Sequence, residues 1–192
     1  MDPTVERVQP PAFEDGLGRR YTVDAGGESL EVLTVRHELA SAPSFEFAVR
    51  ERSTRLSGFL RACYGHVRSV ERVEAEAPAL AVVSERTEGT RLSVLLSTAD
   101  LHAIEFEIDA ALCLTRQVVQ AVALLHEHVP DVAHGAIAPE RLVVTPNARL
   151  VVVDYVFGAA LAELALSRER YWKELRVVLP VGAAIEPRRG RR

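Results

Sequence analysis

The side chains that could carry out chemistry in this sequence are few and lie far apart. The two cysteines, Cys63 and Cys113, form no framework of paired thiols, which is typical of a reducing compartment. His126 and His128 are two positions apart at the end of a predicted helix, a spacing that suits a strand instead. Zinc binding by this pair together with His134 is therefore not expected. No serine has the G-x-S-x-G context of a serine hydrolase.

Asp154 is the best candidate for a functional carboxylate. It follows the apolar run Leu150–Val153, where it could ligate a metal or cap the next turn, and the sequence leaves both interpretations open. Positive charge comes almost entirely from arginine, because the only lysine is Lys173. Arginine does not substitute for lysine in most sites. Any chemistry that needs a lysine before Asp154 in the chain is therefore excluded.

The elements that must position Asp154 follow from the apolar spacing. In the first half, Gly26-Gly27 separates two β-rich runs and predicts a hairpin. A helix is predicted over about 45–62, from apolar residues at helical intervals in a charged stretch. The remaining predicted strands cover 67–73 and 79–83.

The second half is richer in helix. A short helix opens within 91–96, and Asp109 is the expected N-cap of the longest helix. That helix carries one apolar stripe, formed by Leu114, Val118, Val122 and Leu125. A hairpin turning at Pro146-Asn147 follows, and 159–175 is predicted to be partly helical. This order indicates an α+β fold.

The segment from His134 to Val143, HGAIAPERLV, resembles the catalytic loop HRDLKPENIL of eukaryotic-type protein kinases. Its His, Pro and Glu fall at matching positions, and the loop follows a long helix as it does in that family. Val153-Asp154-Tyr155 resembles the start of the DFG motif. The resemblance covers roughly residues 20–180 and implies a two-lobed kinase-like fold.

Upstream residues complete the resemblance. The segment 81–89 is similar to the strand and hinge that border the adenine pocket, with Ser84 at the gatekeeper position and Glu85 at the first hinge position. Glu51 matches the conserved glutamate of the C-helix. His134 would then be structural, as it is in the family.

The resemblance also shows what is missing. Phosphoryl transfer needs a base, a lysine and metal ligands around the phosphates. The catalytic aspartate falls on Ala136, the metal-binding asparagine on Arg141 and the strand lysine near Leu33, while Arg36 is no equivalent substitute. The glycine-rich phosphate loop is absent as well. The resemblance therefore implies a pseudokinase with no catalytic residues, in which Asp154 gives at most weak ATP and Mg²⁺ binding.

Four segments are expected: a flexible leader over 1–18, a kinase-like N-lobe over 19–86, a partial C-lobe over 87–182 and a basic tail over 183–192. Relative to the family, the second lobe is incomplete. The gene product is then a truncation, or a partner supplies the missing surface.

The expected function is a signalling or scaffold module that binds a protein partner. The alternatives are an atypical serine/threonine kinase that binds ATP and a nonfunctional truncated fragment. The net charge of −4 gives no general attraction to nucleic acid. No apolar run of about 20 residues is evident, so neither membrane binding nor a location outside the cytoplasm is expected. The oligomeric state is left open.

Overall fold

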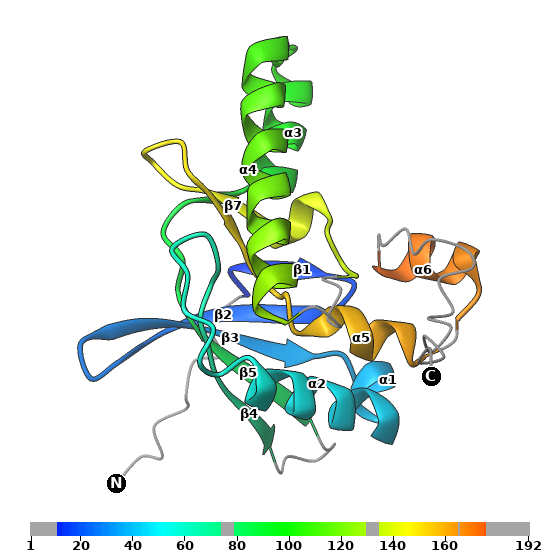
Figure 1. Cartoon of the computed structure of the whole chain (residues 1–192). Helices are drawn as coiled ribbons and strands as arrows, with labels where there is room; N and C mark the ends of the chain where they lie inside the picture. The colour runs from blue at the N-terminus through cyan, green and yellow to red at the C-terminus, as the bar shows by residue number, and fades with distance from the viewer. Residues whose placement is uncertain (1–10, 74–78, 130–134, 165, 176–192) are drawn as a thin grey trace, which may run out of the picture.

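Residues 11–73, 79–129, 135–164 and 166–175 are described by the computed structural model of the chain (Figure 1). Within them, one antiparallel sheet of five strands has the order β1-β2-β3-β5-β4. These strands are β1 (Phe13–Asp15), β2 (Gly18–Ala25), β3 (Glu28–Val35), β4 (Val67–Val73) and β5 (Ala79–Glu85). The predicted hairpin around Gly26-Gly27 is confirmed, since both glycines have positive φ and join β2 to β3. The predicted leader over 1–18 is wrong in its last part, because β1 pairs with β2 there.

Two helices, α1 (His37–Ala40) and α2 (Pro43–Arg55), follow β3. Helix α2 buries Phe45 and Val49, and the Phe45 ring stacks on Phe157 with 6.1 Å between centroids. The prediction that this helix continues to about residue 62 is wrong. Leu56 already caps it, and Phe59 reaches the core from the following turn instead.

The second part of the fold contains a sheet whose described strands are β6 (Thr90–Arg91), β7 (Leu142–Val144) and β8 (Leu150–Val152). The predicted hairpin at Pro146-Asn147 is therefore confirmed. Its helices are α3 (Leu92–Leu101), α4 (Ile108–His128), the 3₁₀ turn η1 (Pro139–Arg141), α5 (Phe157–Ala162) and α6 (Arg168–Leu175). The two helices α3 and α4 extend away from the five-stranded sheet (Figure 1).

Helix α4 is the longest element. It begins at Ile108 with Glu107 as its N-cap, so Asp109 lies in the first turn and not at the predicted cap position. Of the predicted stripe, Leu125 is buried, while the other three residues are half-buried. The stripe packs toward the second sheet, and Tyr64 donates a hydrogen bond of 2.9 Å to the Ala121 carbonyl.

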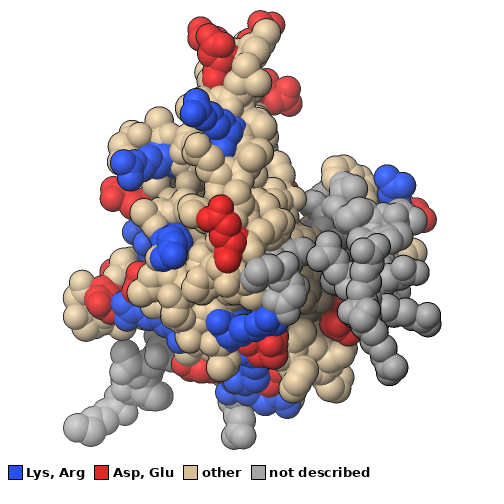
Figure 2. Space-filling view, in the orientation of Figure 1, with Lys and Arg blue, Asp and Glu red and all other residues tan. Residues whose placement is uncertain are grey.

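Helix α4 bears on the expectation that no segment of the chain crosses a membrane. With 21 residues and a mean hydropathy of 1.5 in its most apolar window, it is long and apolar enough to cross a membrane by length and composition. The core helix of a water-soluble protein passes the same test, but such a helix is mostly buried, whereas only 11% of this window is. Charge does not favour an anionic membrane, because the acidic residues at the α3–α4 turn gather at the projecting end of the molecule (Figure 2).

The two parts meet between the five-stranded sheet, β8 and α5. An aromatic cluster of Phe59, Tyr64 and Tyr155 packs edge to face in this region, with centroids 5.0 to 6.1 Å apart. The junction is therefore a packed core, and it fixes Asp154, two residues after β8, relative to the strands β2 and β3.

Candidate functional site

Asp154 lies at the centre of the junction, in the turn between β8 and α5. Its backbone has φ of +59°, a left-handed conformation that is uncommon for a residue other than glycine and that aspartate tolerates better than most. The turn directs the carboxylate toward the five-stranded sheet, and only 9% of the side chain is exposed. A charge held in this way must be paired.

Arg20 on β2 pairs with Asp154. Its Nη2 donates to Asp154 Oδ2 at 2.6 Å, and its side chain is fully buried. Strand alternation explains this placement, because the neighbouring Arg19 points to solvent and Arg20 points to the junction. In the sheet register Arg20 lies directly opposite Leu33, the position nearest to the expected strand lysine. An arginine from the adjacent strand thus takes up the space next to Leu33.

The turn between β1 and β2 adds a second carboxylate. Asp15 Oδ1 lies 3.0 Å from Arg20 Nη1 and accepts a hydrogen bond from the Leu17 backbone N–H at 2.9 Å. That bond to a backbone group two residues on is the usual local contact of aspartate in turns. It holds Asp15 beneath the sheet, where its side chain is 5% exposed.

Arg91 reaches the same place from the start of α3. Its Nη2 donates to Glu31 Oε1 at 2.6 Å, and its Nη1 lies 3.7 Å from Asp154 Oδ2. The guanidinium also lies 4.6 Å from the centroid of the Phe13 ring, a cation–π distance. Glu31, on β3, lies 3.4 Å from Arg20 as well and so bridges the two arginines.

Arg141, where the sequence resemblance expects a metal-binding asparagine, is fully buried at the end of η1. It donates to the Ala136 carbonyl at 3.2 Å and to the Leu175 carbonyl at 3.3 Å. Burial lowers the pKa of its guanidinium, an effect that Asp154 and Asp15 only partly offset. An arginine remains charged even so.

These side chains form what we call the ion cluster, defined as Arg20, Arg91, Arg141, Asp15, Glu31 and Asp154. Three positive and three negative groups neutralise one another. Burial alone would raise the pKa of Asp154, but the charges of Arg20, Arg91 and Arg141 outweigh it and hold that pKa below its usual range. Asp154 is therefore an ionised carboxylate that is already paired with arginine side chains.

The space between the expected hinge and Asp154 is nearly filled. Ser84, Glu85, Thr87 and Asp154 line a cavity of only about 20 Å³. That volume holds about one water molecule, whereas cavities for small organic ligands measure about 300–1,000 Å³. Glu85 and Thr87 also line a neighbouring cavity of about 400 Å³, but Asp154 does not. At Asp154 itself the space is too small for a metal-bound nucleotide, and this carboxylate, the expected metal ligand, faces Arg20.

The other predicted site residues lie in different parts of the structure. Ser84 and Glu85 line the small cavity, and Glu85 accepts hydrogen bonds from Arg68 Nη2 at 2.9 Å. Ala136 is fully buried, and its side chain has no group able to move a proton. Glu51 does not join the site, because it lies on the exposed face of α2 with Arg55 4.0 Å away. His134 lies outside the described residues.

Sequence reasoning missed Arg20, Arg91, Asp15 and Glu31. The residue pattern of β2 contains no signal for Arg20, because it follows another arginine, Arg19, and its partner is 134 positions away in the chain. Among the residues that the structure describes, no group of three or more His, Cys, Asp or Glu side chains could hold a metal ion.

Comparison with solved structures shows a protein kinase-like fold. The kinase domain of Mycobacterium tuberculosis PknI superposes with a TM-score of 0.61 and 13% identity, over 77% of this chain and 57% of that domain. The kinase domain of maize SIRK1, sucrose-induced receptor kinase 1, bound to AMP-PNP, gives a TM-score of 0.62 and 18% identity, over 82% and 57%. The sequence matches no family model and no curated protein.

At these identities the likeness establishes the fold alone. It confirms the predicted α+β, two-lobed kinase-like architecture with a partial second lobe. The chain spans less than two thirds of the length of the kinase domains that it matches.

Proposed function

We propose that this chain, whose fold is kinase-like, is a catalytically inactive module that acts by binding a protein partner in signalling or as a scaffold. One observation carries the proposal: Asp154 pairs with Arg20 at 2.6 Å in a buried, neutralised cluster. A carboxylate in this state would have to break a charge-assisted hydrogen bond before it could ligate Mg²⁺.

The chemistry at neighbouring positions supports the same conclusion. Ala136 offers no base, and Arg141 would repel a metal ion where the family has an asparagine. Loss of one electrostatic stabiliser typically lowers a rate by about 10²–10³. Here the base, the lysine and a metal ligand are replaced together, although such losses do not add simply.

A phosphotransfer assay tests the proposal. Purified chain is incubated with radiolabelled ATP, Mg²⁺ or Mn²⁺ and a general protein substrate, next to the Asp154→Ala variant. The expected result is incorporation equal to the variant's background. Incorporation that Asp154→Ala abolishes would overturn the proposal and favour the second candidate, an atypical serine/threonine kinase that uses its one retained ligand.

A third candidate is a nonfunctional fragment that exposes part of its core. Two observations support this candidate. The chain is shorter than the matched kinase domains, and α4 exposes apolar residues such as Leu112 and Val119. Light scattering of the purified chain separates the two cases. A stable monomer or a defined dimer supports a binding module, whereas polydisperse aggregates support the fragment.

A further inference from the structure

A second, much larger cavity lies on the other side of the ion cluster. Its volume is about 730 Å³, and it is bounded by the β1–β2 turn at Asp15 and Gly16, by α3 and by the end of α6 at Leu175. This volume is within the range of protein binding pockets. The cavity is separate from the small space at Ser84 and Glu85, because the two share no lining residue.

The cavity is lined by polar atoms that lack partners. Asp15 Oδ2, Ser93 Oγ and Glu140 Oε2 are buried and have no hydrogen-bond partner among the residues that the structure describes. Buried acceptors are nearly always satisfied in folded proteins, and leaving one unpaired is unfavourable. Two of the three atoms are carboxylate oxygens, which accept hydrogen bonds and donate none. The missing group is therefore a donor.

The charges around the cavity indicate that this donor is cationic. Four carboxylates line the space, those of Glu14, Asp15, Glu140 and Glu174, against two cations. Glu14, Asp15 and Glu174 already pair with Arg19, Arg20 and Arg36, so Glu140 is the carboxylate whose charge the cavity still has to match. Both cations are already engaged, because Arg36 Nη2 donates to Glu174 at 3.0 Å and Lys173 Nζ donates to Glu169 at 2.7 Å. Arg36 Nε is also buried without a hydrogen bond in the described part of the chain. Because Arg36 is already paired with Glu174, it does not supply the donor that the other carboxylates lack.

A guanidinium group fits these requirements. It carries five N–H donors in a planar fork that matches carboxylates, so one arginine side chain could satisfy more than one acceptor. A lysine ammonium is a more compact, more strongly hydrated point charge. The cavity thus favours arginine.

We propose that this cavity binds arginine side chains of the chain's own C-terminal segment, Pro187–Arg192. That segment reads PRRGRR and carries four arginines and no acid. The chain leaves the described structure at Leu175, which itself lines the cavity. The twelve residues from there to Pro187 could span about 40 Å when extended, enough to return to Asp15 and Glu140.

Because the C-terminal segment belongs to the same chain as the cavity, its binding there would be intramolecular. A connection of this length gives the tail an effective concentration in the millimolar range, so an arginine contact with a Kd well below that range would be largely formed. The tail would then compete with any external arginine-rich segment for the cavity. This inference does not depend on whether the chain transfers phosphate.

A peptide titration tests the proposal. A fluorescein-labelled peptide Pro-Arg-Arg-Gly-Arg-Arg is titrated into the full chain and into a full-length variant in which Arg188, Arg189, Arg191 and Arg192 are all glutamine. Removing the internal competitor should tighten peptide binding about tenfold. Equal affinity for both proteins would overturn the proposal that the tail occupies the cavity, and so would an absence of binding to either.

Substitutions at the cavity locate the binding. In the glutamine-tail background, Glu140→Gln should weaken peptide binding about tenfold, the expected effect of losing a charge-assisted hydrogen bond. Glu105→Gln, which removes an exposed carboxylate outside the cavity, is the matched control and should leave binding unchanged. If Glu140→Gln does not fold, Ser97→Lys places a cation on the exposed α3 wall of the cavity and should weaken binding as much. Binding that neither substitution weakens would overturn the assignment of the site.

Discussion

Arg20 and Asp154 are 134 positions apart in the chain, yet their side chains meet at 2.6 Å beneath the sheet. The pair places a permanent cation against the carboxylate that the sequence resemblance expects to bind metal. Burial opposes both charges, and the positive charges of Arg20, Arg91 and Arg141 outweigh it at Asp154 and hold the pKa of that carboxyl below its usual range. This pair of residues is therefore the main support for the proposal that the chain is catalytically inactive.

Replacing Arg20 with leucine should destabilise the fold strongly. The change leaves Asp154 buried without its hydrogen-bonded partner, with only the weaker influence of Arg91, at 3.7 Å, and of Arg141, and breaking such a pair costs about 3–5 kcal/mol. Urea denaturation measures the change in unfolding free energy. Arg19→Leu is the control, since that side chain is 61% exposed and should change stability by less than about 0.5 kcal/mol. Equal effects of the two substitutions would show that the buried pair contributes little.

The ion cluster also predicts sensitivity to acid. Because the pKa of Asp154 is lowered in the folded state, its contribution to stability is full above the unfolded pKa of about 3.9 and is lost as the pH falls through the lower, folded value. Urea midpoints measured from pH 6 down to pH 3 should fall in the wild-type chain. The Asp154→Asn variant should lose less over the same interval, and a decline as steep as the wild type's would contradict this assignment.

Helix α6 contacts two arginines at the edge of the site, Arg141 and Arg36. Its last carbonyl, at Leu175, accepts from Arg141, and Glu174 accepts from Arg36. This packing needs a glycine at position 16, because a Cβ there would lie 2.0 Å from the Glu174 carbonyl oxygen. The backbones of the β1–β2 turn and of α6 thus lie close together at Gly16.

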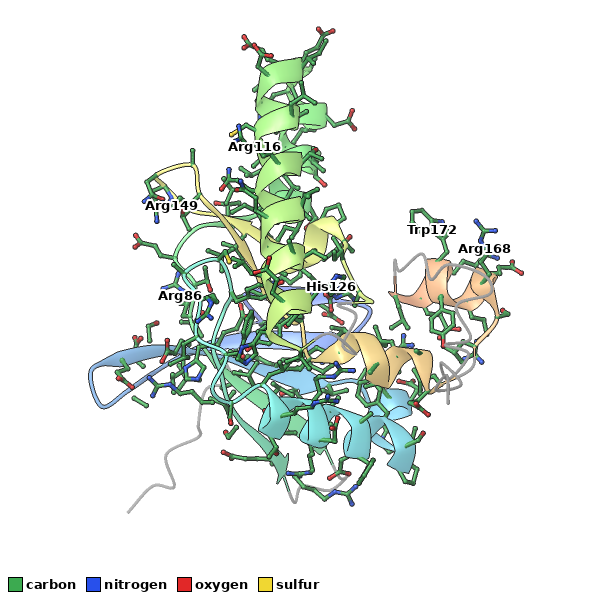
Figure 3. The ribbon with its side chains drawn as sticks, in the orientation of Figure 1. Arg86, Arg116, His126, Arg149, Arg168 and Trp172 are labelled. Atoms are coloured by element: carbon green, nitrogen blue, oxygen red, sulfur yellow. The ribbon has the colours of Figure 1, made fainter. Side chains whose placement is uncertain are left out.

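Gly16→Ala should therefore displace α6. Overpacking of this kind costs about 1–3 kcal/mol, and the only tryptophan in the chain reports it, because Trp172 points outward from α6 (Figure 3). We expect a lower unfolding free energy together with a changed Trp172 emission spectrum. Gly58→Ala is the control, since a Cβ at that position meets no described atom within 4 Å. An unchanged spectrum in Gly16→Ala would contradict the contact.

Local chemistry explains which elements the sequence predicts. Gly26-Gly27 and Pro146-Asn147 allow only tight turns between β-rich runs, so both hairpins follow directly. The end of α2 does not follow, because Leu56 and Phe59 keep helical spacing but enter the core from a turn. The loop positions Ala136 and Arg141 could be identified by spacing. The pairing of Arg20 with Asp154 could not, because it depends on the three-dimensional meeting of the two parts.

At the scale of the whole molecule, the outer surface of α4 is the least explained feature. Ile108, Leu112 and Val119 are each more than 60% exposed, and the matched kinase domains are considerably longer than this chain. Where exposed apolar side chains join into one surface, that surface marks a contact site or a liability for aggregation.

Polar substitutions on α4 should reduce this exposed apolar surface. The double variant Leu112→Gln with Val119→Gln should bind less of the dye ANS and scatter less light than the wild-type chain, because ANS reports accessible apolar surface. Val23→Gln, at an exposed apolar residue on β2, is the control and should leave dye binding nearly unchanged. Unaltered fluorescence of the double variant would mean that α4 is covered in solution.

The most direct test of the central claim, that Arg20 and its partners have replaced a nucleotide site, is thermal unfolding of the chain during titration with ATP, with and without Mg²⁺. A ligand present at 100 times its Kd would add about 2.7 kcal/mol, which in a chain of this size raises the Tm by about 5–10 °C. The account predicts no change in Tm up to millimolar Mg·ATP. A saturable increase that depends on Mg²⁺ and disappears in Asp154→Ala would contradict it.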